Sequence, residues 1–328
     1  MRTSTLGRTG AAVSSLGLGT WQLGADWGDV SDSDARAVLD AALESGVTMF
    51  DTADVYGDGR SEQLIGRYLA DRPEADVFVA TKMGRRVPQE PENYSTQNFR
   101  AWNDRSRANL GVDTLDLVQL HCPPTAVYSI DRVFDDLDQL VEEGRIRHYG
   151  VSVERVDEAL AAMERPNLAT VQIIINAFRL KPLDAVLPVA VDRGIGIIAR
   201  VPLASGLLSG KYTRETTFAE NDHRHYNRDG AAFDVGETFS GVDYESGVAA
   251  AVEFSALAEQ HGLAPATAAL AWLAQLPGVS TVIPGARSPE QARANAAAGE
   301  VDDLPPAFHE SVVELYDRYF RAAIHERW

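Results

Sequence analysis

Short apolar runs alternate with amphipathic segments along almost the whole chain. The runs LGLGT, VTMFD, VFVATK, LDLVQLH, IRHYGVS, TVQIIIN, IGIIAR and STVIPG each have the length and composition of a buried strand. Between them, apolar residues recur at helical spacing over residues 31–43, 61–69, 96–110, 133–141, 156–163 and 183–191. Short buried strands separated by helices predict an α/β fold, a closed (β/α)8 TIM barrel. A doubly wound open sheet is the alternative.

Several further segments depart from this alternation. Residues 3–14 place two short strand patterns around Gly7-Arg8-Thr9-Gly10, which predicts a β-hairpin that caps the barrel. Residues 211–247 are polar and irregular, which is typical of either a functional loop such as a lid or a disordered insertion. Helical patterns over 248–261 and 265–276 precede the last strand, and another over 306–323 follows it. Because no linker interrupts these elements, we expect one domain over residues 1–328.

Composition narrows the classes of function. The 328 residues carry a net charge of −18 with a pI near 4.8, and such a surface repels nucleic acids and anionic membranes. The start MRTSTLGRTG lacks the apolar core of a signal peptide, and no uninterrupted apolar run could cross a bilayer, so we expect a cytoplasmic protein. The single cysteine, Cys122, agrees with a reducing compartment. The sequence does not indicate an oligomeric state.

Polar residues close three consecutive expected strands. Asp51 ends the second strand, Lys82 the third and His121 the fourth, and Tyr56 lies on the loop after Asp51. Each alone is typical of a turn, a solvated strand end or a packed ring, but together they occupy equivalent positions on neighbouring units. Because the loops at the carboxyl ends of barrel strands converge on one face, we expect the four side chains to meet there.

This set of side chains suits proton transfer to a carbonyl oxygen. A free phenol has a pKa of about 10, and a nearby ammonium lowers that pKa toward the range of a useful acid. An ion pair with Asp51 would keep Lys82 charged, and His121 would orient the substrate oxygen through a hydrogen bond. The acid is then Tyr56. A carbonyl that gains a proton must also gain a hydride, which no side chain supplies, so a nicotinamide cofactor is implied.

The common dinucleotide and phosphate signatures do not locate this cofactor. Residues 194–199 have the spacing of a dinucleotide fingerprint, but they form an expected strand and not the turn after one. Residues 205–211, SGLLSGK, approach a phosphate loop but lack its first glycine, and Tyr212 follows where Ser or Thr is required. Their small side chains would still let the backbone approach a pyrophosphate.

Several motifs together resemble the aldo-keto reductase family over nearly the whole chain. GLGTW, FDTADVYG with SEQLIG, ATK, LDLVQLH, IRHYGVS, PLASGLLSGKY and VIPGARSPEQARAN occur in the family's order and at roughly its spacing. The resemblance implies an NADP(H)-dependent oxidoreductase that reduces aldehydes or ketones to alcohols on a TIM barrel. It also matches the family's catalytic residues to Asp51, Tyr56, Lys82 and His121, with Tyr56 as the proton donor.

The resemblance further implies a path for the cofactor along the strand ends. Beside the nicotinamide and pyrophosphate it places Gly19, Thr20, Trp21, Asp51, Ser152, Gln172 (with Asn176 nearby), Arg200, Val201, Pro202, Leu203, Ser205, Gly206, Leu207, Ser209 and Lys211. At the adenosine end it places Ile283, Gly285, Arg287, Gln291 and Asn295. Arg287 has the charge and planar fork that suit a 2′-phosphate, which favours NADP over NAD. A solvated arginine at a helix start is the alternative.

Three positions depart from the family pattern. Val153 stands where many members have asparagine, Ile175 where tyrosine is common, and Arg200 where an aromatic ring often stacks on the nicotinamide. Because a guanidinium is planar, we interpret Arg200 as a residue that could take over this stacking role.

The sequence leaves the substrate open. Trp21, Tyr56, Met83, His121 and Phe178, together with Trp102, would line a mouth that admits small aldehydes, ketones or sugars, although packing also explains the hydrophobic members. One alternative function is a cofactor-binding regulatory subunit of the same fold with slow turnover. A metal-dependent hydrolase is a weaker alternative because its candidate ligands, His223 and His225, lie away from any strand end, so we expect no metal.

Overall fold

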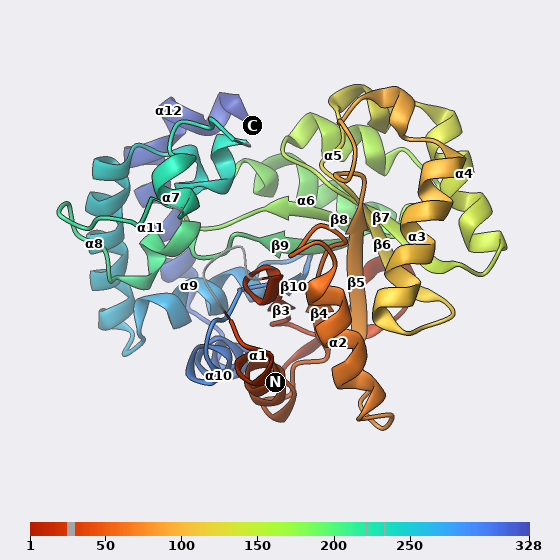
Figure 1. The fold of residues 1–328 in the computed structure, drawn as a ribbon. Coiled ribbons are helices and arrows are strands. Elements are labelled where there is room, and N and C mark those ends of the chain that lie inside the picture. The colour runs from red at the N-terminus through yellow and green to blue at the C-terminus, as the bar shows by residue number, and fades with distance from the viewer. Residues whose placement is uncertain (25–29, 221, 233) are drawn as a thin grey trace.

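A curled parallel sheet forms the centre of the computed structural model, which describes residues 1–24, 30–220, 222–232 and 234–328 (Figure 1). The described residues contribute eight strands, which follow one another in the sheet in chain order. They are β3 (Leu18–Gly19), β4 (Met49–Asp51), β5 (Phe78–Met83), β6 (Leu115–His121), β7 (Ile146–Ser152), β8 (Thr170–Ile174), β9 (Gly196–Arg200) and β10 (Val279–Val282).

Parallel bridges join the two edges of this sheet. Leu16 pairs with Val282 and Gly19 pairs with Gly285, which brings the start of the sheet against its end. A doubly wound sheet would reverse its strand order at a switch point, whereas this order never reverses. The prediction of a (β/α)8 barrel is therefore confirmed.

Helices lie between the strands in sequence and cover the outside of the sheet (Figure 1). They include α1 (Asp32–Glu44), α2 (Arg60–Ala70), α3 (Thr96–Leu110), α4 (Asp131–Glu142), α5 (Val156–Met163) and α6 (Lys181–Arg193), and α10 (Pro289–Ala297) follows the last strand. Helix α1 begins where its cap predicts, because the side chain of Ser31 accepts a hydrogen bond from the backbone nitrogen of Asp34.

The segment 211–247 has more regular structure than its composition indicated. It contains α7 (His223–Tyr226), the 3-10 turns Val235–Glu237 and Phe239–Gly241, and the start of α8 (Tyr244–Gln260). Residues 221 and 233 of this predicted loop lie outside the described residues. The apolar spacing predicts a helix that starts at residue 248, but α8 starts at Tyr244. The earlier start is explained by Asp243, whose side chain caps the helix by accepting a hydrogen bond from the backbone nitrogen of Ser246.

Two additions complete the fold after β9 and after β10. Helix α9 (Pro265–Ala274) follows α8 and leads to β10. The predicted helix over 306–323 is interrupted, since α11 (Pro306–Tyr316) runs into a π-helical turn at Asp317–Arg321 before α12 (Ala322–Ile324). No helix in the described part of the chain is both long and apolar enough to span a membrane.

The N-terminal hairpin closes one end of the barrel. Strands β1 (Thr3–Thr5) and β2 (Ala12–Ser14) pair antiparallel, as predicted. Leu6 and Val13 are fully buried in an inner cluster. The cluster also contains Met49, Ala80, Leu117, Ile198 and Ile283 from the barrel strands. Gly7 permits this contact, because a Cβ atom at residue 7 would lie 2.0 Å from the backbone nitrogen of Gly196.

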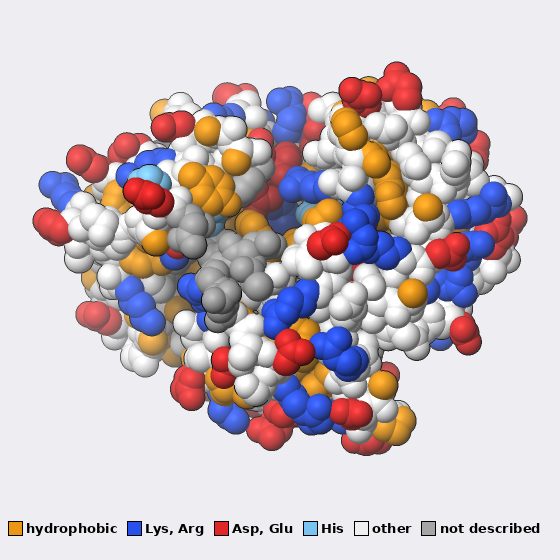
Figure 2. All heavy atoms as spheres, viewed as in Figure 1, with side chains coloured by type: hydrophobic (Ala, Val, Ile, Leu, Met, Phe, Trp, Pro, Cys, Tyr) orange, Lys and Arg blue, Asp and Glu red, His pale blue; other side chains and the backbone are white. Residues whose placement is uncertain are grey.

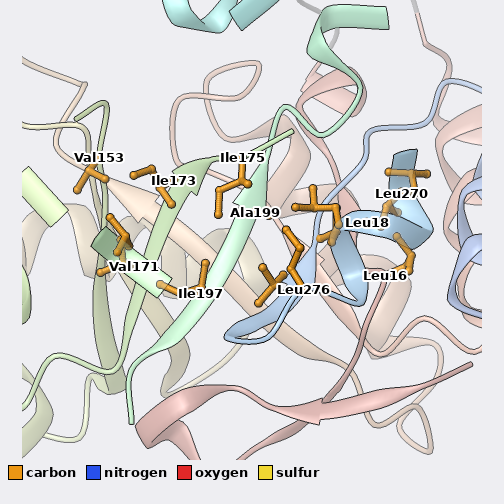
Figure 3. Packing of buried hydrophobic residues seen from close by; sticks show 14 of the residues in the cluster. Leu16, Leu18, Val153, Val171, Ile173, Ile175, Ile197, Ala199, Leu270 and Leu276 are labelled. Atoms are coloured by element: carbon orange, nitrogen blue, oxygen red, sulfur yellow. The ribbon is translucent and has the colours of Figure 1, made fainter. Parts of the chain in front are cut away.

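A second, larger core lies between the sheet and the helices. Its residues on β8 and β9 include Val171, Ile173, Ile197 and Ala199, whose side chains lie together in Figure 3. Gln172 and Ile198 alternate with them along the same strands and face the barrel interior. Both faces of these strands are buried, which explains why the sequence shows continuous apolar runs there.

Candidate active site

The side chains inside the barrel change from apolar to polar along the strands. On four strands an inner apolar side chain lies two positions before a polar one: Met49 and Asp51, Ala80 and Lys82, Leu117 and Gln119, Ile198 and Arg200. Because side chains alternate across a strand, residues two apart face the same way. The barrel therefore has an apolar floor closed by the hairpin and a polar mouth at the carboxyl ends of its strands.

Asp51 and Lys82 form a buried ion pair in this mouth. Lys82 Nζ contacts Asp51 Oδ1 and donates to the carbonyl oxygen of Thr52 at 2.9 Å, and both side chains are at most 3% exposed. The other carboxylate oxygen, Asp51 Oδ2, accepts hydrogen bonds from the side-chain amides of Gln172 and Gln119 at 2.8 and 3.3 Å. Burial lowers the pKa of Lys82, but Asp51 and Tyr56 raise it, and the net shift is upward. Lys82 is therefore charged.

Tyr56 lies directly beside this ion pair. Its hydroxyl is 3.4 Å from Lys82 Nζ, and the ammonium is 5.1 Å from the centre of its ring. The sequence argument held that Lys82 lowers the pKa of the phenol. That interaction is present, but burial is the larger influence and the net shift of the pKa is upward. Tyr56 therefore keeps its proton at neutral pH, as a proton donor requires.

The rings of His121 and Trp21 both lie next to the ring of Tyr56. The His121 ring meets the Tyr56 ring edge-on with centroids 6.0 Å apart, and the Trp21 ring stacks on it at 6.0 Å. Burial lowers the pKa of His121 well below its usual value, and the nearby charges of Arg85, Lys82 and Arg200 lower it further. The imidazole is neutral at physiological pH, so it can donate one hydrogen bond without carrying charge. The structure thus brings the four predicted catalytic side chains together.

Arg200 is held between two carboxylates. Its Nη2 atom is 2.9 Å from Glu154 Oε2 and donates to the carbonyl oxygen of Val153 at 2.9 Å, and its Nη1 atom contacts Glu237. Burial lowers the pKa of Arg200, but both carboxylates raise it, and the net shift is strongly upward. The guanidinium is therefore fixed at the rim of the mouth. Its stacking on a nicotinamide stays a prediction.

The turn after β9 contains several residues with left-handed backbone angles. Val201, Ala204, Ser205, Gly206 and Gly210 all have positive φ angles, between 48° and 99°. Non-glycine residues rarely adopt such angles, and they gather where backbone N–H groups form a concave binding surface. Ser205 ties this turn to the segment above it, because its hydroxyl donates to the carbonyl oxygen of Glu237 at 2.9 Å. The N–H groups of Ala204, Gly206 and Gly210 already donate to carbonyl oxygens within the turn. Binding of a pyrophosphate by residues 201–210 stays a prediction.

The residues predicted to hold the nicotinamide carboxamide do not all have the same surroundings. Ser152 is buried beside Cys122 and Gln172 faces Asp51, so both line the mouth. Asn176 instead joins two loops, since its Nδ2 donates to the carbonyl oxygen of Val201 and to Ser240 Oγ while its Oδ1 accepts from the backbone of Phe178. Asn176 therefore holds the backbone of the neighbouring loops in place.

The predicted adenosine end gathers at the start of α10. Gln291 Oε1 accepts from the backbone nitrogen of Arg287 at 2.8 Å, and Asn295 Nδ2 donates to the carbonyl oxygen of Gly285 at 3.1 Å. The Arg287 residue is exposed. Ile283 and Gly285 continue from β10 into the same turn, so the structure brings the predicted group together.

Three predicted mouth residues lie elsewhere. Met83 faces the helices because it alternates with Lys82 along β5, and its sulfur is 3.3 Å from Asn103 Nδ2 on α3. Trp102, also on α3, packs against Phe99 with ring centroids 5.9 Å apart. Phe178 is fully buried against Phe320 of the C-terminal segment. The prediction that these residues line the mouth is wrong, and packing explains all three.

Sequence reasoning also missed residues that face the mouth. Gln119 follows from alternation, because it lies between Leu117 and His121 on the inner face of β6. Glu154 and Arg85 lie in loops just beyond strand ends, where periodicity gives no signal. Figure 2 shows acidic, basic and histidine side chains together in a hollow at the centre of one face of the molecule.

Other hollows and candidate ligands do not lead to a second site. A surface hollow of about 660 Å³ is lined by Arg100, Arg107, Glu143 and Arg145, away from the strand ends that carry the tetrad. Among residues 1–24, 30–220, 222–232 and 234–328, no three His, Cys, Asp or Glu side chains are grouped to hold a metal ion. His223 lies beside Trp21, with ring centroids 5.9 Å apart.

Comparisons with known proteins agree with this geometry. The sequence model described as "Aldo/keto reductase family" matches residues 15–317. The chain is 30% identical to the Aldo-keto reductase YhdN of Bacillus subtilis over 308 residues, which covers 90% of this chain and 87% of the relative. It resembles the structure of the glycerol dehydrogenase AKR11B4 from Gluconobacter oxydans with a TM-score of 0.79 and 30% identity, over 98% and 95% of the two chains. An aldo/keto reductase from Klebsiella pneumoniae, solved in complex with NADP and acetate, shares the fold with a TM-score of 0.70 at 24% identity, over 96% and 95% of the chains.

Proposed function

The chain belongs to the aldo/keto reductase family, and from this premise we propose that it reduces aldehydes or ketones to alcohols with NADPH as the hydride donor. The observation that carries the proposal is the position of Lys82 Nζ, which contacts Asp51 and lies 3.4 Å from the Tyr56 hydroxyl. A protonated phenol beside a fixed ammonium is a proton donor whose conjugate base is already stabilised.

The residues of the mouth account for the proton. Bound NADPH supplies the hydride that adds to the carbonyl carbon. Tyr56 Oη gives its proton to the carbonyl oxygen, so that the product is a neutral alcohol and the phenolate is left beside Lys82. The charge of Lys82 stabilises this phenolate until solvent returns the proton. Neutral His121 donates a hydrogen bond to the carbonyl oxygen and orients it, because its lowered pKa keeps it uncharged.

The described residues also fit the cofactor. Ser152 and Gln172 would hold the carboxamide, the turn from Val201 to Gly210 would bind the pyrophosphate through its backbone, and Arg287 would bind the 2′-phosphate. The positive φ angles of that turn support this assignment independently of the resemblance. The complex of the Klebsiella pneumoniae protein with NADP supports NADP over NAD.

The Tyr56→Phe variant tests the function. We expect kcat for a panel of aldehydes to fall by roughly 10²–10⁴-fold, the usual contribution of a general acid. The dissociation constant of NADPH, measured by tryptophan fluorescence, should stay within about twofold and remain below that of NADH. Tyr319→Phe is the matched control, because this tyrosine contacts Glu253 away from the mouth and its loss should leave kcat unchanged.

Two results would contradict the proposal. Full activity in Tyr56→Phe would remove the proton-donor role. NADPH binding by the wild type without any steady-state oxidation of NADPH would instead favour the regulatory-subunit alternative.

A further inference from the structure

The main chain is strained directly after the histidine of the tetrad. His121 is the last residue of β6, and Cys122 after it has a left-handed backbone with a φ angle of 48°. A residue with a side chain keeps such an angle only where surrounding contacts enforce it. One of these contacts comes from β7, because the backbone nitrogen of Cys122 donates to the carbonyl oxygen of Ser152 at 3.1 Å.

Two side chains from the loop after β5 hold the carbonyl groups of the same two residues. Arg85 Nε donates to the carbonyl oxygen of His121 at 3.0 Å. Gln89 Nε2 donates to the carbonyl oxygen of Cys122 at 2.8 Å and to that of His121 at 3.3 Å. The loop of one barrel unit therefore fixes the strand end of the next unit.

The His121 ring has no hydrogen bond of its own on one nitrogen. Its Nδ1 atom is buried and lacks a hydrogen-bond partner among the described residues. In many sites a functional histidine is oriented by such a bond on the nitrogen that does not meet the ligand. The direction of this ring is instead set by the main chain that carries it and by its edge-on contact with Tyr56.

Arg85 also acts on the charge of the imidazole. Burial is the largest influence that lowers the pKa of His121, and the charge of Arg85 follows, ahead of Lys82 and Arg200. The guanidinium keeps this place through its bond to the His121 carbonyl oxygen and through Glu154, whose Oε1 atom is 3.9 Å from Arg85 Nη2. The group that holds the main chain thus also disfavours the imidazolium.

We propose that Arg85 and Gln89 are positioning residues for the reaction, because they hold the main chain of His121 and Cys122 so that the imidazole meets the substrate oxygen beside Tyr56. This inference rests on the proposed carbonyl reduction, in which His121 orients that oxygen. The effect of both side chains on turnover passes through the imidazole. It should therefore vanish where the imidazole is absent.

A double-mutant cycle with His121→Ala tests this dependence. With benzaldehyde and NADPH, we expect Arg85→Ala/Gln89→Ala to lower kcat by roughly 10- to 100-fold, since a small misplacement of a reacting group costs up to about 10²-fold. KM should stay within about threefold, because the lost interaction belongs to the transition state. In the His121→Ala background, the same two substitutions should change kcat by less than about twofold. Residues that only stabilise the fold of the mouth would lower kcat in both backgrounds.

The ring signal of His121 gives a second readout that does not depend on turnover. In a carbon–proton NMR spectrum of the histidine rings, this signal is the one that His121→Ala removes. In Arg85→Ala/Gln89→Ala without cofactor, the signal should shift or broaden because the main chain that carries the ring is released. It decides the question alone where His121→Ala turns over too slowly to measure.

The chain offers a matched control for each side chain. Arg193 on α6 is similarly exposed (33% against 27% for Arg85) and also binds a backbone carbonyl and a glutamate. Gln275, like Gln89, donates from Nε2 to two consecutive carbonyl oxygens, those of Val301 and Asp302 at 3.3 and 3.1 Å. Arg193→Ala/Gln275→Ala should keep the wild-type kcat and the His121 signal.

A conservative variant checks that the hydrogen bond matters and not the bulk of the side chain. Arg85→Lys keeps a charge and a donor without the planar fork. Its kcat should lie between those of wild type and Arg85→Ala, and the His121 signal should stay closer to its wild-type position.

The outcomes separate this inference from the function on which it rests. An equal loss of kcat with and without the imidazole would overturn the positioning role while carbonyl reduction stands. Full activity in Arg85→Ala/Gln89→Ala or in His121→Ala, or an unmoved His121 signal, would overturn it as well. Failure of the wild type to oxidise NADPH with any carbonyl would instead remove the proposed function.

Discussion

The floor and the mouth of the barrel are built on the same strands but hold different side chains. The floor contains the apolar side chains of Met49, Ala80, Leu117, Ile198 and Ile283 under the hairpin. The mouth, two residues further along, holds Asp51, Lys82 and Arg200. Burial of apolar atoms stabilises the floor, whereas burial of charges in the mouth requires compensation at each group. Stability and chemistry are thus separated along each strand.

Asp51 and Asp54 show how unequal that compensation is between a strand end and the loop that follows it. Asp51 is satisfied by one ammonium and two amides. Asp54, three residues on, is fully buried and neither of its carboxylate oxygens has a hydrogen-bond partner among the residues described. A buried carboxylate keeps its negative charge where it has partners, and it takes up a proton where it has none.

The largest effect should come from breaking the ion pair of the mouth. In Lys82→Met we expect kcat to fall by on the order of 10²–10⁴-fold, because the Tyr56 phenolate loses its stabilising charge. The free energy of unfolding should fall by about 3–5 kcal/mol, because Asp51 is left buried with only amide partners. Steady-state NADPH oxidation and denaturant unfolding measure the two quantities.

The double variant Asp51→Asn/Lys82→Met separates these two effects. Removing both charges should restore most of the lost stability, but activity should stay low. Recovery of activity together with stability would mean that Lys82 acts only on folding.

A change in the floor should lower stability while leaving activity nearly unchanged. Leu117→Ala removes a fully buried side chain from the inner cluster and should lower the free energy of unfolding by about 2–5 kcal/mol. Below the unfolding transition, kcat/KM should stay within about threefold of wild type, since the lost atoms lie under the mouth. A loss of activity comparable to that of Lys82→Met in folded protein would show that floor and mouth are coupled.

The separation between floor and mouth was largely predictable from the sequence. Eight apolar runs, each ending near a polar residue, are enough to predict the barrel, and equivalent positions on β4, β5 and β6 predict the meeting of Asp51, Lys82 and His121. Alternation also excludes Met83 from the mouth once Lys82 is placed inside. The assignment of Met83 to the mouth is wrong because β5 continues through Met83, whose side chain lies on the face opposite to that of Lys82.

The loop residues around the mouth could not be predicted in the same way. Arg85 follows β5 within a loop, and Glu237 belongs to an irregular segment whose path across the mouth depends on Ser205 and Arg200. Loop paths are set by contacts distant in sequence, which leave no periodic signal. The direction of the net shift of the Tyr56 pKa also could not be predicted from the sequence, because it depends on how deeply the phenol is buried.

The smallest effect concerns the pH dependence of stability that Asp54 imposes and the apolar floor does not. Burial, followed by the charge of Glu62, raises the pKa of Asp54 to about 7. The folded protein therefore holds a proton that the unfolded chain has released, so Asp54 makes stability fall as pH rises from about 4 to about 7. Asp54→Asn removes this dependence, and between pH 5 and pH 8 the variant should gain about 2–3 kcal/mol relative to wild type.

Urea unfolding at pH 5, 6.5 and 8 measures the Asp54 effect as a difference between two proteins, in which the other titrating groups cancel. Asp58→Asn is the control, because Arg86 and Arg105 hold the pKa of that exposed carboxyl below its usual value. Its difference from wild type should be flat above pH 5, since Asp58 is ionised in both states. Parallel curves for Asp54→Asn and wild type would mean that Asp54 is solvated or paired in the folded protein.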